Sequence, residues 1–416
     1  MSHFRYVNGE LYCEGVALRA VADSAGTPTY VYSKAALLES FAAYDRAFSG
    51  VPHVVCYALK ANGNLAVLAA LARAGAGADI TSGGELYRAL RAGVLPEKIV
   101  FAGVGKTREE MREALKAEIL CFNVESASEL RALGETAQAM GVRAPVALRV
   151  NPDVDPQTHP YISTGLRTAK FGIAIAEAAR VYEDAARMPG IEVVGVQMHI
   201  GSQLTKTSPF ADSLGRVAAL VEDLRRRGIT LRLIDIGGGL GIRYDDETPP
   251  SHDQYAEALR PALGRLGLTV LLEPGRSIVG IAGALLTRAL YRKTGPDKTF
   301  VIVDAAMNDL IRPALYDAYH EIRPAAESAA ARPRETVDVV GPICESGDFL
   351  ARDRELPRVD EGDLLAVMSA GAYGFAMASN YNARPRAAEV LVDGGSHSIV
   401  RRRETYEDLV AGEGMP

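Results

Sequence analysis

Lys60 stands at the end of an apolar run, where its amine could take part in covalent chemistry. The run Val54-Val55-Cys56-Tyr57-Ala58-Leu59 precedes it and the turn-forming segment Ala61-Asn62-Gly63-Asn64 follows, as is typical of a buried strand that ends in a turn. An ammonium at such a position loses part of its hydration, which favours the neutral amine that condenses with an aldehyde. The alternative is a lysine whose side chain simply leaves the strand and reaches water.

Other residues capable of chemistry also stand at the ends of strand-like runs. They are Asp79, Arg149, His199, the triple glycine Gly237–Gly239 and Glu273. A packed core does not need a lysine, a histidine and two carboxylates there, because each is costly to bury without a partner. Their coincidence over several strands predicts one common site and favours the chemical interpretation of Lys60.

Two glycine-containing segments are suited to a flat ring and an anion. His199-Ile200-Gly201-Ser202 offers an imidazole that can stack on a ring, followed by the Ser202 hydroxyl. The Gly237-Gly238-Gly239 backbone can approach an anion closely, and a helix that begins soon afterwards would add its positive dipole end. The alternatives are a histidine satisfied within the core and a tight turn after a strand.

Glu273-Pro274-Gly275-Arg276 places a carboxylate at the end of the last strand-like run, with an arginine three residues later. A surface ion pair is the alternative interpretation of these two side chains.

Eight strand-like runs alternate with segments of helical periodicity and must position these residues. Such alternation indicates parallel βαβ units, and eight units in roughly 240 residues suit a closed (β/α)₈ TIM barrel. A doubly wound open sheet is the alternative, although a dinucleotide fingerprint normally opens the first unit and not the seventh. The expected strands are 53–59, 78–81, 99–102, 119–124, 146–150, 193–200, 231–236 and 269–272.

The region after about residue 280 has short alternating segments separated by turn residues, which is an all-β pattern. Strands are expected at 299–303, 336–340, 364–368 and 389–392, and a hairpin at 4–17 with its turn at Asn8-Gly9. We therefore expect a β-domain, of β-sandwich or β-barrel type, built from both chain ends. The predicted boundaries are 1–33 and 281–416 for this domain and 34–280 for the barrel.

The composition excludes several classes of protein. A chain of 416 residues with 48% hydrophobic and 24% charged residues suits two soluble domains. A net charge of −6 argues against non-specific nucleic-acid binding, and no apolar stretch is long enough to suggest a membrane span. Four scattered cysteines without a Cys-x-x-Cys motif suggest neither disulfides nor a zinc site, and the first ten residues do not resemble a signal peptide. These features predict a soluble cytoplasmic protein without a metal.

Six motifs in order resemble the pyridoxal-phosphate-dependent diaminopimelate decarboxylases, which are alanine-racemase-type barrel enzymes. The segment from His159-Pro160-Tyr161 to Lys170-Phe171-Gly172 also resembles this family more than its relatives. The resemblance covers nearly the whole chain and implies a barrel, a β-domain and a homodimer with active sites shared between subunits. The motifs are Tyr57–Asn62, His199–Gln203, Gly237–Gly239, Glu273–Arg276, Cys344–Asp348 and Gly371–Gly374.

The resemblance implies a role for each residue around pyridoxal 5'-phosphate. Lys60 would hold the cofactor as a Schiff base, His199 would stack on its ring, and Glu273 would keep the pyridine nitrogen protonated, which strengthens the electron sink. The phosphate would be held by Ser202, by the glycine backbone and by Tyr373. The complete implied cofactor-binding set is Lys60, Asp79, Arg149, His199, Ser202, Gly237, Gly238, Gly239, Glu273, Gly275, Arg276 and Tyr373.

The resemblance also implies how a substrate would be recognised. Cys344 would donate a proton from the partner subunit, a role that suits a thiol, whereas an inert buried cysteine is the alternative. Glu345 would bind the distal ammonium, while a distal carboxylate calls for the N–H fork of an arginine. Substrate-binding residues would be Arg276, Arg312, Tyr316, Glu345 and Tyr373.

The implied reaction is that of a carboxy-lyase that converts meso-2,6-diaminopimelate to L-lysine and CO₂, the last step of lysine biosynthesis. One alternative is a decarboxylase of the same fold acting on ornithine, lysine or a carboxylated polyamine, which Arg312 disfavours. A racemase would need a catalytic tyrosine in place of Cys344 and Glu345. A non-catalytic barrel that binds the cofactor would not need the β-domain.

Overall fold

The computed structural model describes residues 3–154 and 170–416, and these residues form two compact units. The barrel unit consists of Ser40–Ile242 and Glu247–Ser277, and the β unit consists of Met1–Glu39, Arg243–Asp246 and Ile278–Pro416. Among the described residues, we find no helix with the length and apolar character that crossing a membrane requires.

Eight parallel strands of the barrel unit form a closed ring. Each strand pairs with its neighbours, and the pairing of β8 with β9 closes the ring, which confirms the predicted barrel over the open-sheet alternative. In addition, β10 (Ile173–Ala174) pairs with β9 outside the ring. The ring consists of β5 (His53–Ala58), β6 (Gly77–Ile80), β7 (Ile99–Phe101), β8 (Cys121–Val124), β9 (Ala144–Asn151), β11 (Ile191–Gln197), β12 (Leu233–Asp235) and β13 (Thr269–Leu272).

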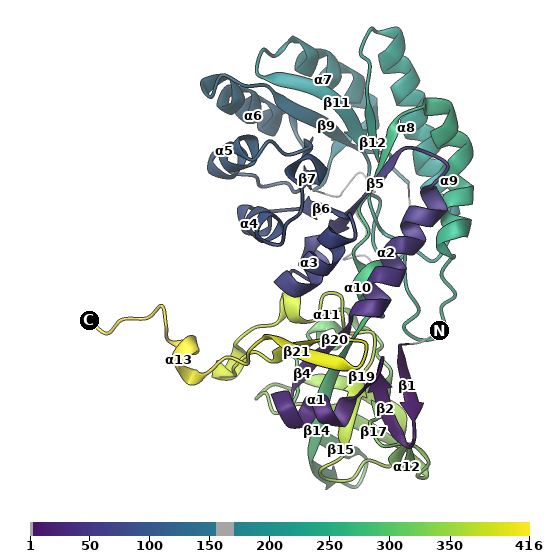
Figure 1. The fold of residues 1–416 in the computed structure, drawn as a ribbon, viewed down its shortest axis with the longest axis vertical. Coiled ribbons are helices and arrows are strands. Elements are labelled where there is room, and N and C mark those ends of the chain that lie inside the picture. The colour runs from purple at the N-terminus through teal and green to yellow at the C-terminus, as the bar shows by residue number, and fades with distance from the viewer. Residues whose placement is uncertain (1–2, 155–169) are drawn as a thin grey trace. The chain divides into compact units, whose positions relative to one another are not determined.

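Helices lie on the outside of this ring (Figure 1). Several begin directly after a polar residue whose side chain accepts a backbone N–H, as Asn64, Ser82, Thr107 and Ser126 do. These caps fix where each helix starts, so the loops at the carboxyl ends of the strands stay short. The helices are α2 (Lys34–Phe48), which crosses the unit boundary, α3 (Leu65–Arg73), α4 (Gly83–Arg91), α5 (Arg108–Lys116), α6 (Ala127–Ala139), α7 (Ile175–Arg187), α8 (Ser208–Arg226), α9 (His252–Leu266) and α10 (Arg276–Val279).

The β unit contains a large mixed sheet to which both ends of the chain contribute. Strand β4 (Thr29–Ser33) lies between β14 (Gly283–Thr294) and β20 (Ala388–Asp393), as the purple and yellow segments in Figure 1 show. The predicted hairpin is also present, because β1 (Phe4–Val7) pairs with β2 (Glu10–Cys13) across Asn8 and Gly9, which both have positive φ.

Of the remaining elements of the β unit, β3 (Val16–Ala17) extends the β1–β2 hairpin to a separate three-stranded sheet, and the others belong to the large sheet or flank its strands in the sequence. These others are α1 (Leu18–Ala25), β15 (Thr299–Val303), α11 (Arg312–Tyr316), β16 (Ile322–Pro324), α12 (Glu327–Ala330), β17 (Arg334–Val340), β18 (Phe349–Pro357), β19 (Leu364–Val367), β21 (Ser396–Arg401) and α13 (Tyr406–Leu409).

Candidate active site

Lys60 lies where the sequence places it, in the short 3₁₀ turn Leu59–Ala61 directly after β5. Its Nζ donates to Asp79 Oδ2 at 2.7 Å, and Asp79 follows Ala78 on the neighbouring strand β6. The Lys60 side chain is 39% exposed, whereas the Asp79 side chain is fully buried. The barrel therefore directs one accessible amine at its carboxyl end and fixes its position with a carboxylate.

His199 follows β11 and is held as a neutral imidazole. The N–H of Gly238 donates to His199 Nδ1 at 3.2 Å, so the ring proton is carried by Nε2. Burial lowers the pKa of His199 well below its usual value, and the positive charges of Arg149 and Lys60 lower it further. A neutral ring in a fixed orientation suits stacking.

The triple glycine follows β12 and is required by the backbone around it. Gly237 and Gly239 have φ values of +69° and +112°, and a Cβ on Gly238 would lie 2.1 Å from the Glu273 carbonyl oxygen. The expectation of a helix soon after the glycines is wrong, because the next helix, α9, begins only at His252. Since β12 runs into a loop at this point, no helix dipole supports the glycine turn.

Arg276 begins α10 and turns towards the turn that follows His199. Its Nε and Nη2 atoms donate to Ser202 Oγ at 3.3 and 3.0 Å. Gly275 precedes it, and a Cβ there would lie 3.0 Å from Ala61 Cβ beside Lys60. The Glu273–Arg276 segment is thus buried next to two other predicted segments and is not a surface ion pair.

Arg149 lies on β9 and is buried. Its Nη1 donates to Glu125 Oε1 at 3.2 Å, and its guanidinium lies 4.7 Å from the centre of the Phe171 ring. Its Nη2 atom is buried without a hydrogen-bond partner. An unsatisfied charged donor in the barrel is the kind of group that a bound anion or acceptor satisfies.

Glu273 lies in a buried network with residues from three other strands. Asn123 Nδ2 donates to Asp235 Oδ2 at 2.8 Å and to Glu273 Oε1 at 3.1 Å. Gln197 Nε2 donates to Glu273 Oε2 at 3.2 Å. Burial, followed by the negative charges of Asp235 and Asp79, raises the pKa of Glu273 well above its usual value. The network therefore favours the protonated form of the Glu273 carboxyl group.

Arg312, the first residue of α11 in the β unit, is buried between two aromatic rings. Its Nη1 lies 2.9 Å from His320 Nε2, and its guanidinium lies 4.5 Å from the centre of the Tyr244 ring. His320 Nδ1 lies 2.8 Å from the Met368 carbonyl oxygen. Since that carbonyl only accepts, Nδ1 carries the ring proton and Nε2 is the acceptor for Arg312. Tyr316 is the last residue of the same helix.

Cys344 and Glu345 lie on the loop between β17 and β18, and both residues are exposed. Asp348 shapes this loop, because its two carboxylate oxygens accept the N–H groups of Met307 and Ile343, each at 2.7 Å. The Cys344 N–H donates to Asn382 Oδ1 at 2.9 Å. A hydrogen bond with Glu345 raises the pKa of Tyr381.

Tyr373 follows β19 and has a φ of +56°, in the left-handed region. The glycines on either side of it are required for packing, since a Cβ on Gly371 would lie 1.9 Å from the Val279 carbonyl oxygen and one on Gly374 2.5 Å from that of Ala370. The Gly371–Gly374 motif therefore holds Tyr373 in a strained turn.

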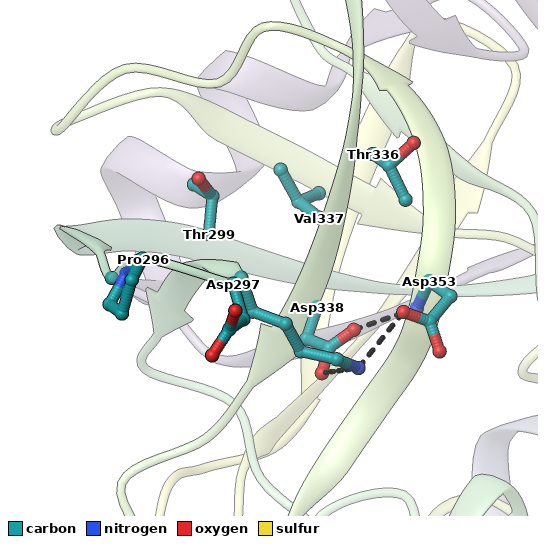
Figure 2. Close-up of a pocket in the computed structure, with 9 residues that line it drawn as sticks. Pro296, Asp297, Thr299, Thr336, Val337, Asp338 and Asp353 are labelled. Atoms are coloured by element: carbon teal, nitrogen blue, oxygen red, sulfur yellow. Dashed lines mark hydrogen bonds and ion pairs between the residues drawn. The ribbon is translucent and has the colours of Figure 1, made fainter.

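A separate pocket of about 210 Å³ lies at the turn between β14 and β15 (Figure 2). Lys298 Nζ lies 2.9 Å from both Asp338 and Asp353 there, so its ammonium already neutralises these carboxylates. None of the residues predicted for the site lines this pocket.

Comparison with known proteins identifies the family of the chain. Residues 34–280 match the family of the pyridoxal binding domain of pyridoxal-dependent decarboxylases. The diaminopimelate decarboxylase of Pseudomonas aeruginosa is 58% identical over 100% of this chain and 99% of that protein. The chain belongs to the diaminopimelate decarboxylase family. It is thus a carboxy-lyase that uses pyridoxal phosphate, as the resemblance implied.

Solved structures support the same assignment. The diaminopimelate decarboxylase of M. jannaschii in complex with L-lysine is 41% identical and has a TM-score of 0.95 over 100% of this chain and 99% of that one. A lysine/ornithine decarboxylase of Vibrio vulnificus is 22% identical, with a TM-score of 0.80 over 91% and 97% of the two chains. At that identity the second likeness extends to the fold alone.

The barrel residues fit the cofactor. Lys60 supplies the amine for an aldehyde, and the buried atoms Asp79 Oδ1, Arg149 Nη2 and Gln197 Oε1 have no hydrogen-bond partner. Unpartnered polar atoms around an accessible amine indicate a polar ligand that completes them.

Several residues with a role in this arrangement were not predicted from the sequence. In the barrel they are Asn123, Glu125, Gln197 and Asp235; in the β unit they are Tyr244, His320, Asp348, Tyr381 and Asn382. Asp235 could have been recognised as a site residue from the sequence, because it is a carboxylate inside an apolar run and stands two residues before the triple glycine. Of the segment predicted from His159 to Gly172, residues 159–169 lie outside the described part of the chain.

Proposed function

We propose that the chain decarboxylates the D-configured centre of meso-2,6-diaminopimelate and releases L-lysine and CO₂, which completes lysine biosynthesis. When bound, pyridoxal phosphate supplies the conjugated ring that takes up the electron pair left by CO₂. The proposal assigns every other task to side chains of this protein.

Lys60 forms the covalent link to the cofactor, and Asp79 keeps its amine in position. His199 lies flat on the ring in its neutral form, and Arg149 lines the same end of the barrel. Ser202, Arg276, the Gly237–Gly239 backbone and Tyr373 hold the phosphate, with Gly275 leaving room for the segment beside Lys60. Glu273 holds a proton at the ring nitrogen.

The far end of the substrate carries both an ammonium and a carboxylate. Glu345 binds the ammonium, and Arg312, with Arg276 and Tyr316, binds the carboxylate. The buried guanidinium of Arg312 carries this assignment, because its Nη1 is held by His320 and its face by Tyr244, which leaves the fork in one orientation. A simple diamine precursor has no carboxylate there and cannot form this ion pair with the arginine.

Cys344 donates the proton that replaces the lost carboxylate. We assign it to the active site of a partner subunit, so that the functional unit is a homodimer with shared sites. We further propose a cytoplasmic location, no role for nucleic acid or membranes, and functional boundaries at residues 33/34 and 280/281.

Release of CO₂ by the purified protein tests this function. We expect meso-diaminopimelate to be the preferred compound in a panel with lysine, ornithine and a carboxylated polyamine, and activity to need added pyridoxal phosphate. Turnover of lysine at the same rate as meso-diaminopimelate would refute the substrate assignment, and the absence of CO₂ from every compound would refute the reaction.

A further inference from the structure

Two buried carboxyl groups of the barrel unit, Glu273 and Asp235, accept from the same nitrogen, Asn123 Nδ2, at 3.1 and 2.8 Å. They come from the ends of neighbouring strands, β13 and β12, whose paired residues include Asp235 and Leu271. Two buried carboxylates that share one donor repel each other, and a proton held between them relieves this repulsion.

The other hydrogen bonds of the pair locate this proton. Glu273 accepts from Asn123 at Oε1 and from Gln197 at Oε2, while Asp235 accepts from Gly237 N–H at Oδ1, 2.9 Å away, and from Asn123 at Oδ2. Each of the four oxygens thus already accepts an N–H from the protein. Any hydrogen between the two groups is then a carboxyl proton, and the Asn123 amide bridges both groups from one nitrogen.

The charges around the pair favour one shared proton. Asp79 adds the negative charge of a third buried carboxylate, and Lys60 is the cation that opposes these charges at Glu273. The uncharged groups that face the pair are Cys56, Cys121 and Tyr255, whose pKa values burial and these carboxylates raise, so they remain protonated. Both carboxylates can be ionised together only if a further cation arrives.

We infer that Asp235 is a positioning residue that shares one proton with Glu273 in the cofactor-free protein, and that this proton passes from the Glu273 carboxyl to the pyridine nitrogen when pyridoxal phosphate binds. One O–H bond breaks and one N–H bond forms, and no other bond changes. The protonated ring then faces a dicarboxylate and not a single carboxylate, which strengthens its hold on the proton. The inference rests on the proposed function only in taking Glu273 as the partner of the ring nitrogen.

The same pair makes the stability of the cofactor-free protein depend on pH. Burial raises the pKa of Asp235 to about 6 and the pKa of Glu273 further. A carboxyl group whose pKa is raised by folding stabilises the folded state at low pH and loses this contribution as the pH rises through the folded value. The cofactor-free protein should therefore lose stability as the pH rises from about 4, the usual pKa of these groups, through their raised folded values, and bound cofactor should oppose this loss.

Infrared difference spectroscopy of the cofactor-free protein at pH 7.5–8 tests the shared proton directly, because a protonated carboxyl group has its own C=O band. We expect the band in the wild type and its loss in Glu273→Gln. In Asp235→Asn, burial and Asp79 still favour the protonated Glu273 carboxyl, so the band should remain but shift in frequency because its partner has changed. Adding pyridoxal phosphate should remove the band, whereas inorganic phosphate, which cannot supply a ring nitrogen, should leave it. A band that survives in Glu273→Gln or in the protein with bound cofactor, or a band that Asp235→Asn leaves at the wild-type frequency, would overturn the inference.

A second measurement separates the shared proton from a structural role. The unfolding midpoint of the cofactor-free wild type should fall as the pH rises. For one linked proton, the unfolding equilibrium constant should rise by up to about tenfold per pH unit. Asp235→Asn and Glu273→Gln should flatten this dependence, whereas a merely structural residue would lower the midpoint equally at every pH. Asp309→Asn is the matched control, because burial also raises the pKa of Asp309, to about 7, and it lies in the β unit.

The effect of Asp309→Asn should add to that of Asp235→Asn, whereas the effects of the two barrel variants should not add. Additive effects of Asp235→Asn and Glu273→Gln would mean two independent protons and would overturn the inference. Neither measurement uses substrate, so a failure of the substrate assignment leaves both outcomes unchanged.

Discussion

The barrel unit and the β unit present their chemically important residues in opposite ways. In the barrel, Asp79, Arg149 and Glu273 are buried and joined to partners by hydrogen bonds, and the Lys60 side chain is 39% exposed. In the β unit, Cys344 and Glu345 are exposed on a loop. Most of the residues proposed to hold the cofactor are therefore fixed within the barrel, whereas the proposed proton donor lies on an exposed loop.

Replacing Lys60 should have the largest effect on activity, because the barrel residues position its amine. Lys60→Ala should reduce CO₂ release below detection. Borohydride reduction of the wild type with bound cofactor should leave a covalent pyridoxyl group on Lys60, detectable by peptide mass spectrometry. Lys106→Ala is the matched control, since this lysine is buried against Glu129 elsewhere in the barrel and should keep the adduct on Lys60. An adduct on any other lysine would refute the assignment.

Mixing two inactive variants tests whether Cys344 acts in the active site of a partner subunit. Cys344→Ala alone should bind cofactor normally but lose about 10²–10⁴-fold in turnover, the usual contribution of a positioned acid. After subunit exchange with Lys60→Ala, about a quarter of wild-type activity should return, because half of the dimers are mixed and each has one intact site. No recovery after exchange confirmed by mass spectrometry of the native dimer would place both residues in one chain's site.

The sequence predicted the barrel elements better than the contacts between them. All eight expected strands are present, because each combines an apolar run with a turn signal, and β13 has the predicted bounds. Strand β18 was not predicted, since its central residues Arg352, Asp353, Arg354 and Glu355 are charged, as is common on the last strand of a sheet.

The network beneath Glu273 could not be predicted, although each residue in it is visible in the sequence. Asn123, Gln197, Asp235 and Glu273 lie on or directly after four different strands, and only the closed ring brings them together. Strand periodicity places a side chain on a face, whereas a hydrogen bond between distant strands depends on their register and on closure of the ring.

A substitution of His320 tests the β unit with a smaller expected effect. It shows whether the orientation of Arg312 depends on its hydrogen bond to His320. His320→Ala removes the acceptor at Arg312 Nη1 and should raise KM for meso-diaminopimelate about tenfold, consistent with the loss of one hydrogen bond to a charged group. The value of kcat should change little, and His320→Gln, which keeps an acceptor, should restore most of the affinity. An equal fall in kcat with unchanged KM would show that Arg312 does not act in substrate binding.

A substitution of Asp348 should have the smallest effect of the four. It tests whether the loop that carries Cys344 and Glu345 is ordered within one chain. Its carboxylate accepts two backbone N–H groups, and Asp348→Asn leaves one of them facing an amide donor or an unsatisfied position. We expect a loss of about 1–3 kcal/mol in unfolding free energy and faster reaction of Cys344 with a thiol reagent, because a buried donor is left unsatisfied and the loop loosens. Asp353→Asn is the control, since this side chain is 71% exposed and pairs with Lys298 at the surface, where its loss should cost less than about 0.5–1 kcal/mol. If Asp348→Asn leaves the reactivity of Cys344 unchanged, the hydrogen bond from Cys344 N–H to Asn382 is sufficient to hold the loop, and the β unit is as preorganised as the barrel.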